Sequence, residues 1–259
     1  MGRKKGIVLL VLVTVVATTI VFSLRPISQP QNYHHFCDNR LMFDIPSFAN
    51  VISNIGFIVV GLMGLCRVRQ SVAPKIIKII YIFVFMGIFL TAFGSAFYHY
   101  SPNNATLVYD RLPMTIVFMA ITAAALAEGV GLVIGGIVLA PLLLIGCASI
   151  LWWRYSEIRG SGDLRLYALV QYYPVILIPL ILLLFPNFRI RKGWPPLLLC
   201  FGWYALAKIA EGLDCKIYVA LGQQVSGHTI KHVAATIATG YLVQRFRLMH
   251  DDPISSMNI

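Results

Sequence analysis

Residues 76–97 read Ile76-Ile-Lys-Ile-Ile-Tyr-Ile-Phe-Val-Phe-Met-Gly-Ile-Phe-Leu-Thr-Ala-Phe-Gly-Ser-Ala-Phe97, with Lys78 as the single charged residue. About 20 apolar residues are enough to span the hydrocarbon core of a bilayer as an α-helix. The run lacks the strict alternation of apolar and polar residues that marks a strand of a membrane barrel. Because hydrocarbon offers the backbone no hydrogen-bonding partner, the run predicts a membrane-spanning helix.

Similar runs recur along the whole chain. Of its 259 residues, 58% are hydrophobic and 12% are charged, a balance typical of membrane proteins. The last two of the eight runs are short and carry charge, which predicts helices buried among their neighbours. The eight runs are Gly6–Leu24, Phe48–Leu65, Ile76–Phe97, Leu107–Ala127, Val130–Leu151, Leu166–Phe185, Pro196–Leu213 and Thr229–Val243. We therefore predict an all-α membrane protein, a seven-helix bundle with an extra N-terminal hydrophobic helix.

The first run, within residues 1–24, differs from the others. It follows Arg3, Lys4 and Lys5 and contains only aliphatic and small residues until Phe22, which is the layout of a signal peptide or a signal anchor. Val-Phe-Ser-Leu before Arg25 is a poor cleavage site and favours an uncleaved anchor. We predict an extracytoplasmic segment over residues 25–47, the helical domain over 48–246 and a cytoplasmic tail over 247–259.

The formal net charge of +11 would suggest a nucleic-acid partner in a soluble protein. Here the basic residues lie mostly in short connections, so they predict orientation in the membrane and contact with anionic lipid, and no nucleic acid. With the N-terminus in the cytoplasm, the larger basic group falls on the cytoplasmic side. That group is Arg3, Lys4, Lys5, Arg67, Arg69, Lys75, Arg189, Arg191, Lys192, Arg245 and Arg247. The smaller, outer group is Arg25, Arg40, Arg111, Arg154, Arg159, Arg165 and Lys216.

Two histidines begin the last run, in Ser226-Gly-His-Thr-Ile-Lys-His232. A spacing of four places His228 and His232 on one face of a helix, the spacing that zinc-binding helices use. The alternative is a pair of hydrogen-bonded histidines at a helix interface. Ionisable residues within membrane spans are costly and usually functional, so a metal site is favoured.

A third histidine, His99, follows Ser95 by four residues, so that hydroxyl and imidazole share a helix face. The topology places His99 on the outer side, at the same depth as His228 and His232. Three histidines with one coordination position open are typical of a catalytic zinc site. We predict that these three residues bind one zinc ion.

Asp110 follows a short outer connection, Tyr100–Thr106, in Tyr109-Asp-Arg-Leu-Pro-Met114. We expect its carboxylate near the level of His99, where it can take a proton from zinc-bound water and return it to a leaving group. Two other roles are open: Asp110 pairs with Arg111, or it holds a histidine in place.

The remaining ionisable residues give weaker signals. Lys208, Glu211 and Asp214, at spacings of three on one helix face, either orient a zinc histidine or support the structure, with Glu211 paired to Lys208 or Lys231. The structural role is favoured. The other histidines, which are His34, His35 and His250, are interpreted as solvated.

These residues, in this order, resemble the alkaline ceramidase family, within the wider superfamily of seven-helix zinc-dependent membrane hydrolases. The resemblance covers the chain from about Cys37 to Phe246. It rests on four short motifs, which are Asn50-Val-Ile-Ser53-Asn54, Ser95 with His99, Asp110 followed by Leu112-Pro113-Met114, and His228 with His232.

The resemblance implies a seven-helix bundle with an amidase site at its outer mouth. It assigns the zinc ion to His99, His228 and His232, and catalytic roles to Ser95 and Asp110. The family also has a disulfide between the outer N-terminal segment and the outer end of the sixth core helix. Cys37 and Cys215 stand in those places, and such a bond needs an oxidising compartment.

Calcium is the point on which the chain departs from the family. Eukaryotic members bind calcium through an acidic cluster around the first of those cysteines and at the start of the first core helix. Here only Asp38 and Asn39 remain near Cys37, and the helix begins Ser47-Phe-Ala-Asn50. This departure puts calcium regulation in doubt.

We therefore predict a zinc-dependent intramembrane amidase that hydrolyses ceramide, or a ceramide-like lipid amide, to a fatty acid and a sphingoid base. Asp110 would move the proton, and Ser95 would donate a hydrogen bond to the oxyanion. The acyl chains would lie among apolar helices after lateral entry from the bilayer. Two other functions are open: a lipid- or hormone-sensing receptor of the same superfamily with a structural zinc site, and a transporter that relays protons or metal ions. The sequence leaves the oligomeric state open.

Overall fold

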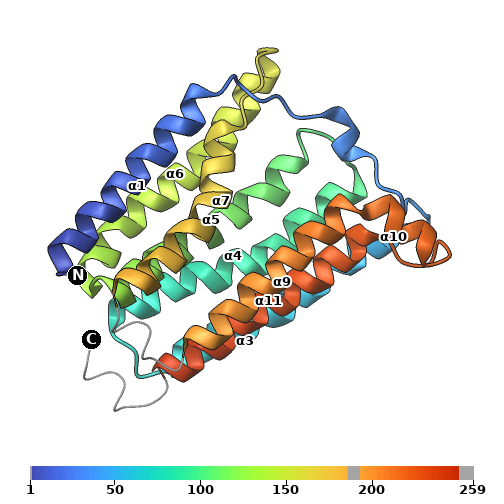
Figure 1. Cartoon of the computed structure of the whole chain (residues 1–259). Coiled ribbons are helices and arrows are strands. Elements are labelled where there is room, and N and C mark those ends of the chain that lie inside the picture. The colour runs from blue at the N-terminus through green and yellow to red at the C-terminus, as the bar shows by residue number, and fades with distance from the viewer. Residues whose placement is uncertain (1, 186–192, 251–259) are drawn as a thin grey trace.

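The computed structural model describes residues 2–185 and 193–250, and the long elements within these ranges are α-helices (Figure 1). The eight apolar runs each fall on one helix or on one pair of consecutive helices, so the predicted all-α membrane fold is confirmed. The helices are α1 (Arg3–Ser23), α2 (Phe48–Ile52), α3 (Ile55–Gln70), α4 (Lys75–Tyr100), α5 (Leu107–Gly129), α6 (Leu132–Ile158), α7 (Arg165–Leu184), α9 (Trp194–Gly212), α10 (Asp214–Ala220) and α11 (Gly227–His250). Two parts of the predicted cytoplasmic side lie outside the described ranges. They are the basic residues Arg189, Arg191 and Lys192, and residues 251–259 of the predicted tail.

Six of the described spans are long and apolar enough to cross a membrane: α1, α2 with α3, α4, α5, α6 and α7. The pair α9 and α10 also qualifies, although it bends by 81° at the break between Gly212 and Asp214. The chain is therefore a multi-pass membrane protein.

The helices form one elongated bundle (Figure 1). Helix α4 packs along α5 and α3, and α11 packs along α9 and α3, whereas α1 lies against α7. Val84, Phe85 and Ile88 of α4 are almost fully buried, which places the apolar core around this helix. Contrary to the sequence prediction, α9 is not buried on all sides, because Leu199, Leu206 and Ile209 are exposed, as expected for a face that contacts lipid.

The bundle has two ends, which we name by the residues that lie there. At the Glu128 end, Arg3 donates a 2.8 Å hydrogen bond to the carbonyl oxygen of Val130, so the start of α1 lies beside the turn between α5 and α6. At this end Glu128 pairs with Arg245, and His250 Nε2 lies 3.0 Å from Glu128 Oε1. The prediction of a solvated His250 is therefore wrong, because its side chain is fully buried and helix α11 runs past the predicted boundary at Phe246.

Two breaks shape the other end, which we call the histidine end. Ser53 and Asn54 interrupt the second predicted run, Phe48–Leu65, and divide it into α2 and α3. The second break separates α9 from α10, so Asp214 begins a new helix. The prediction that Asp214 shares a helix face with Lys208 and Glu211 is therefore wrong.

Candidate metal centre

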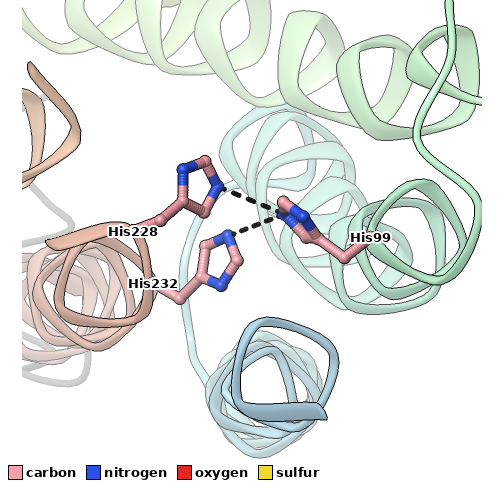
Figure 2. A group of neighbouring side chains, drawn as sticks. All are labelled: His99, His228 and His232. Atoms are coloured by element: carbon pink, nitrogen blue, oxygen red, sulfur yellow. Dashed lines mark hydrogen bonds between the residues drawn. The ribbon is translucent and has the colours of Figure 1, made fainter. Parts of the chain in front are cut away.

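Three histidine rings converge at the histidine end (Figure 2). His99, on the last turn of α4, points its Nε2 towards two rings from the first turns of α11. Its Nε2 lies 3.2 Å from Nε2 of His232 and 3.3 Å from Nε2 of His228. All three side chains are at most 3% exposed. The structure thus brings together the three histidines that the sequence singled out, from segments more than 120 residues apart.

The hydrogen bonds of Ser53 determine which nitrogen of His232 is protonated. Ser53 Oγ donates to the carbonyl oxygen of Asn50 at 3.1 Å, and the same Oγ lies 2.7 Å from His232 Nδ1. Because the hydroxyl proton is already used, Ser53 Oγ accepts a bond from the Nδ1–H group of His232. His232 Nε2 then carries a lone pair directed at the other two rings, as in a metal-binding histidine. Sequence analysis quoted Ser53 within a motif but gave it no role.

The distances between the ring nitrogens fit a tetrahedral metal ion. Zinc binds histidine nitrogen at about 2.0–2.1 Å, and in tetrahedral geometry two such ligands are separated by about 3.3–3.4 Å. The observed separations of 3.2 and 3.3 Å match that value. His99 Nδ1 is buried without a hydrogen-bond partner in the described residues, so Nε2 is the nitrogen of this ring that faces a neighbour capable of sharing a ligand. The donor set of three imidazoles suits zinc.

Two glycines allow the helices that carry these rings to approach closely. A Cβ atom at Gly94 would lie 1.9 Å from the backbone oxygen of Tyr109, so glycine is required where α4 crosses the start of α5. A Cβ atom at Gly227 would lie 2.3 Å from the backbone oxygen of Ala210, where α11 starts against α9. These contacts bring the residues after Gly94 and Gly227, including Ser95 and His228, towards one another.

Ser95 and Asp110 line a common cavity with His232. This apolar cavity, of about 140 Å³, runs down among α4, α5, α7, α9 and α11, and its wall is almost entirely aliphatic and aromatic. Ser95 and Asp110 are 3% and 6% exposed and form part of its polar end. The Arg111 guanidinium donates to Gln29 Oε1 at 2.7 Å, and the described residues show no ion pair between Arg111 and Asp110.

A second cavity adjoins the first and is much more polar. This polar cavity, of about 290 Å³, shares Asp110 and Lys231 with the apolar cavity and is also lined by Arg111, Lys208 and Glu211. Glu211 forms ion pairs with both Lys208 and Lys231, the two partners that the sequence offered as alternatives. Lys231 Nζ also lies 3.2 Å from His228 Nε2, a contact between residues three positions apart on α11 that their spacing alone could have indicated.

Asp214 supports the centre through the backbone and not through a ring nitrogen. Its Oδ1 accepts a 2.7 Å bond from the backbone N–H of His228, and its Oδ2 accepts one from the N–H of Cys37 at 3.2 Å. Cys37 is joined to Cys215 by a disulfide bond, with 5.3 Å between their Cα atoms. The segment before α2 is thereby fixed beside the first turn of α11.

The same N-terminal segment covers the centre. The Phe36 ring lies with its centroid 4.6 Å from that of His99 and 4.5 Å from that of His228. His34 is half-buried, with Nδ1 2.9 Å from Tyr98 Oη and Nε2 2.8 Å from Asn104 Oδ1, so its prediction as a solvated histidine is wrong. Burial lowers the pKa of His34. His35, by contrast, is exposed.

Asp38, the acidic remnant near Cys37, already binds a cation from the chain itself. The Arg40 guanidinium contacts both carboxylate oxygens, at 2.8 and 2.7 Å, and also donates to the backbone oxygen of Gln224. These hydrogen bonds lower the pKa of the Asp38 carboxyl. A calcium ion at Asp38 would have to displace this guanidinium.

The structure so far defines a class: a helical membrane protein with three buried imidazoles that meet at the end of an apolar cavity, which Asp110 also lines. The model of the ceramidase family matches residues 28–178, more than half of the chain, and the chain belongs to this family. Membership supports a ceramide-hydrolysing function. The matched stretch contains Ser95, His99 and Asp110 and ends before α11. Neither a curated protein nor a solved structure matches the chain.

Proposed function

We propose that the protein is a zinc-dependent amidase that hydrolyses ceramide, or a ceramide-like lipid amide, within the membrane. The observation that carries the proposal is the convergence of the Nε2 atoms of His99, His228 and His232 at the polar end of an apolar cavity. Zinc held there would activate water and polarise a carbonyl oxygen at neutral pH. Family membership supports the same class of reaction.

Asp110 and Ser95 are the residues proposed to act on the substrate. Hydrolysis breaks the amide C–N bond, adds the oxygen of water to the acyl carbon and leaves a protonated amine. Asp110 would accept a proton from the attacking water and return it to the leaving nitrogen. Ser95 would donate a hydrogen bond to the carbonyl oxygen as negative charge develops on it. Both side chains line the cavity in which the amide would lie.

The apolar cavity is the proposed acyl-chain site. It is lined by such residues as Phe57, Ile88, Val117 and Leu242, which offer no hydrogen bonds to a ligand. An acyl chain in this cavity would direct its carbonyl group towards Ser95 and Asp110 and the amine half towards the polar cavity. The substrate would enter from the bilayer between helices.

We further propose that the histidine end faces the extracytoplasmic side of the cell membrane. Basic residues that begin α1 and that flank the connection of α3 to α4 lie at the Glu128 end, in the direction of the positive-inside rule. The disulfide of Cys37 with Cys215 lies at the histidine end and is stable in an oxidising compartment. The end of α11 would then face the cytoplasm.

The test is fatty-acid release from ceramides in detergent micelles by the purified protein, measured together with its metal content. We expect about one zinc per chain, release of fatty acid, loss of activity on chelation and recovery with zinc. Full activity in zinc-free protein would contradict the mechanism. Zinc without turnover would favour the receptor alternative, and ion flux in liposomes without hydrolysis would favour a transporter.

A further inference from the structure

The polar cavity carries more positive than negative charge. Of the described side chains that line it, Arg111, Lys208 and Lys231 are cationic, and Asp110 and Glu211 are acidic. Each oxygen of Glu211 is taken by one ammonium, Oε1 by Lys231 at 2.8 Å and Oε2 by Lys208. One lysine therefore neutralises Glu211, and an excess cation faces the cavity. Uncompensated charge is costly at membrane depth, so a bound anion would stabilise this arrangement.

Arg111 offers a hydrogen-bond donor with no acceptor. The residue is 6% exposed, its Nη2 donates to Gln29 Oε1, and its Nη1 is buried without a partner among the described residues. Its guanidinium lies over the rings of Trp153 and Tyr167, at 4.7 and 4.8 Å from their centroids. Aromatic faces supply no hydrogen-bond acceptor of the strength of an anionic oxygen. Arg111 therefore brings its positive charge to the wall of the polar cavity, where an anion would offset it.

Lys231 links this cavity to the metal centre. Its Nζ lies 3.2 Å from His228 Nε2 and 2.8 Å from Glu211 Oε1. The single lone pair of His228 Nε2 serves either Lys231 or a metal ion, so a ligated His228 leaves the ammonium with a donor to direct elsewhere. Lys231 lines both cavities and stands where the two halves of a lipid amide would meet.

From these observations we infer that the polar cavity binds an anionic group on the amine half of the substrate. This inference rests on the proposed amidase function and narrows its substrate class to lipid amides with a phosphate or carboxylate close to the amide nitrogen. The cavity volume of about 290 Å³ leaves room for such a group and for water. Arg111, Lys208 and Lys231 are the residues that would determine this specificity.

The experiment compares matched lipids that differ only in charge. In neutral detergent, kcat/KM is measured for two pairs of lipids: ceramide 1-phosphate against ceramide, and N-acylserine against N-acylserinamide. All four lipids carry the same acyl chain. Binding of sphingosine 1-phosphate against sphingosine is measured by native mass spectrometry on zinc-loaded protein. We expect the anionic member to be favoured about tenfold, the size of one charge-assisted hydrogen bond. Preference in one pair alone identifies phosphate or carboxylate as the recognised group.

Variants separate the polar cavity from general surface charge. Lys208→Gln removes the excess charge at a partly exposed side chain, and it should reduce the anionic preference about tenfold in both rate and binding. Arg111→Gln should do the same if it folds. Arg159→Gln removes an exposed charge at the same end and should keep the preference. Equal use of charged and neutral lipids by the unmodified protein would overturn the inference and leave the amidase intact. Failure to hydrolyse any of the four lipids would overturn the amidase, and the substrate class with it.

Discussion

Two buried polar clusters lie at opposite ends of the bundle, and they differ in the space that adjoins them. In the Glu128 cluster (Tyr81, Glu128, Arg245 and His250), the carboxylate accepts bonds from the Tyr81 hydroxyl, the Arg245 guanidinium and His250 Nε2. The nearby cavity measures about 10 Å³, too little for more than one water. Among the described residues each cluster has a ring nitrogen without a partner, His250 Nδ1 in the first and His99 Nδ1 at the histidine site, but the cavity that adjoins the histidine site measures about 290 Å³.

The comparison distinguishes a polar cluster that stabilises a fold from one that is available to a ligand. Both clusters place charge where desolvation is costly. The Glu128 cluster offsets that cost with its own hydrogen bonds across α4, α5 and α11. At the histidine site, the converging Nε2 atoms and an excess cation adjoin space that a metal ion and a substrate would fill. Changes at the first should affect folding, and changes at the second should affect binding and turnover.

The largest effect is expected for His99→Ala. The imidazole supplies one of the three converging nitrogens, so we expect loss of zinc and a fall in kcat/KM of about 1000-fold or more, since metal catalysis contributes several kcal/mol. Zinc content and fatty-acid release are measured on the same preparation. His35→Ala, at an exposed histidine of the same segment that covers the site, is the matched control and should change neither. Retention of zinc in His99→Ala would remove this histidine from the metal centre.

A smaller loss of activity is expected for Asp110→Asn, with zinc retained. The amide fits the same space but does not accept a proton, and general acid–base catalysis contributes about 10²–10⁴-fold. Zinc content and kcat on ceramide are the measurements, and Asp44→Asn, at an exposed carboxylate, is the control. Unchanged kcat in Asp110→Asn would show that another group moves the proton.

Glu128→Gln should lower the stability of the fold, because it changes the Glu128 cluster and not the histidine site. Removal of the carboxylate charge breaks the buried ion pair of Glu128 with Arg245, which costs about 3–5 kcal/mol of folding free energy. Thermal unfolding should show this loss, whereas zinc content per folded chain should stay the same. Arg247→Gln removes an exposed charge on the same helix and serves as control. Zinc loss from folded Glu128→Gln protein would show that the two clusters are coupled.

The smallest effect is expected for Ser53→Ala. Without the hydroxyl, His232 loses the acceptor that fixes its tautomer, and groups of this kind contribute about 10–100-fold to metal affinity. Competition with a zinc chelator measures the change. Ser53→Thr keeps the hydroxyl and should restore most of the affinity. Equal zinc affinity in Ser53→Ala and in the unmodified protein would show that Ser53 does not position the ring.

Local sequence signals were sufficient for the helices and for the histidine pair on α11. Hydrocarbon thickness determines how long an apolar run must be, so runs such as Ile76–Phe97 predict a helix without knowledge of its neighbours. In the same way, the 3.6-residue period places His228 and His232 on one face whatever surrounds them.

Contacts between distant segments were not accessible from the sequence. The bond of Ser53 with His232 and the partner of His250 each depend on helices that meet only in the folded bundle, whereas Lys231 and His228 are neighbours on one helix. The sequence predicts a solvated His250 in the tail, yet Glu128 of α5 provides it with a buried partner. The excess charge of the polar cavity likewise emerges only when α5, α9 and α11 are assembled.

Zinc K-edge X-ray absorption on the purified, unmodified protein tests the central claim most directly. We predict about three imidazole nitrogens at about 2.0–2.1 Å, one further light ligand and no sulfur. The imidazole signal should be absent from a variant in which His99, His228 and His232 are all replaced by alanine. Protein that purifies without zinc and does not take it up, or zinc bound through sulfur, would contradict the account.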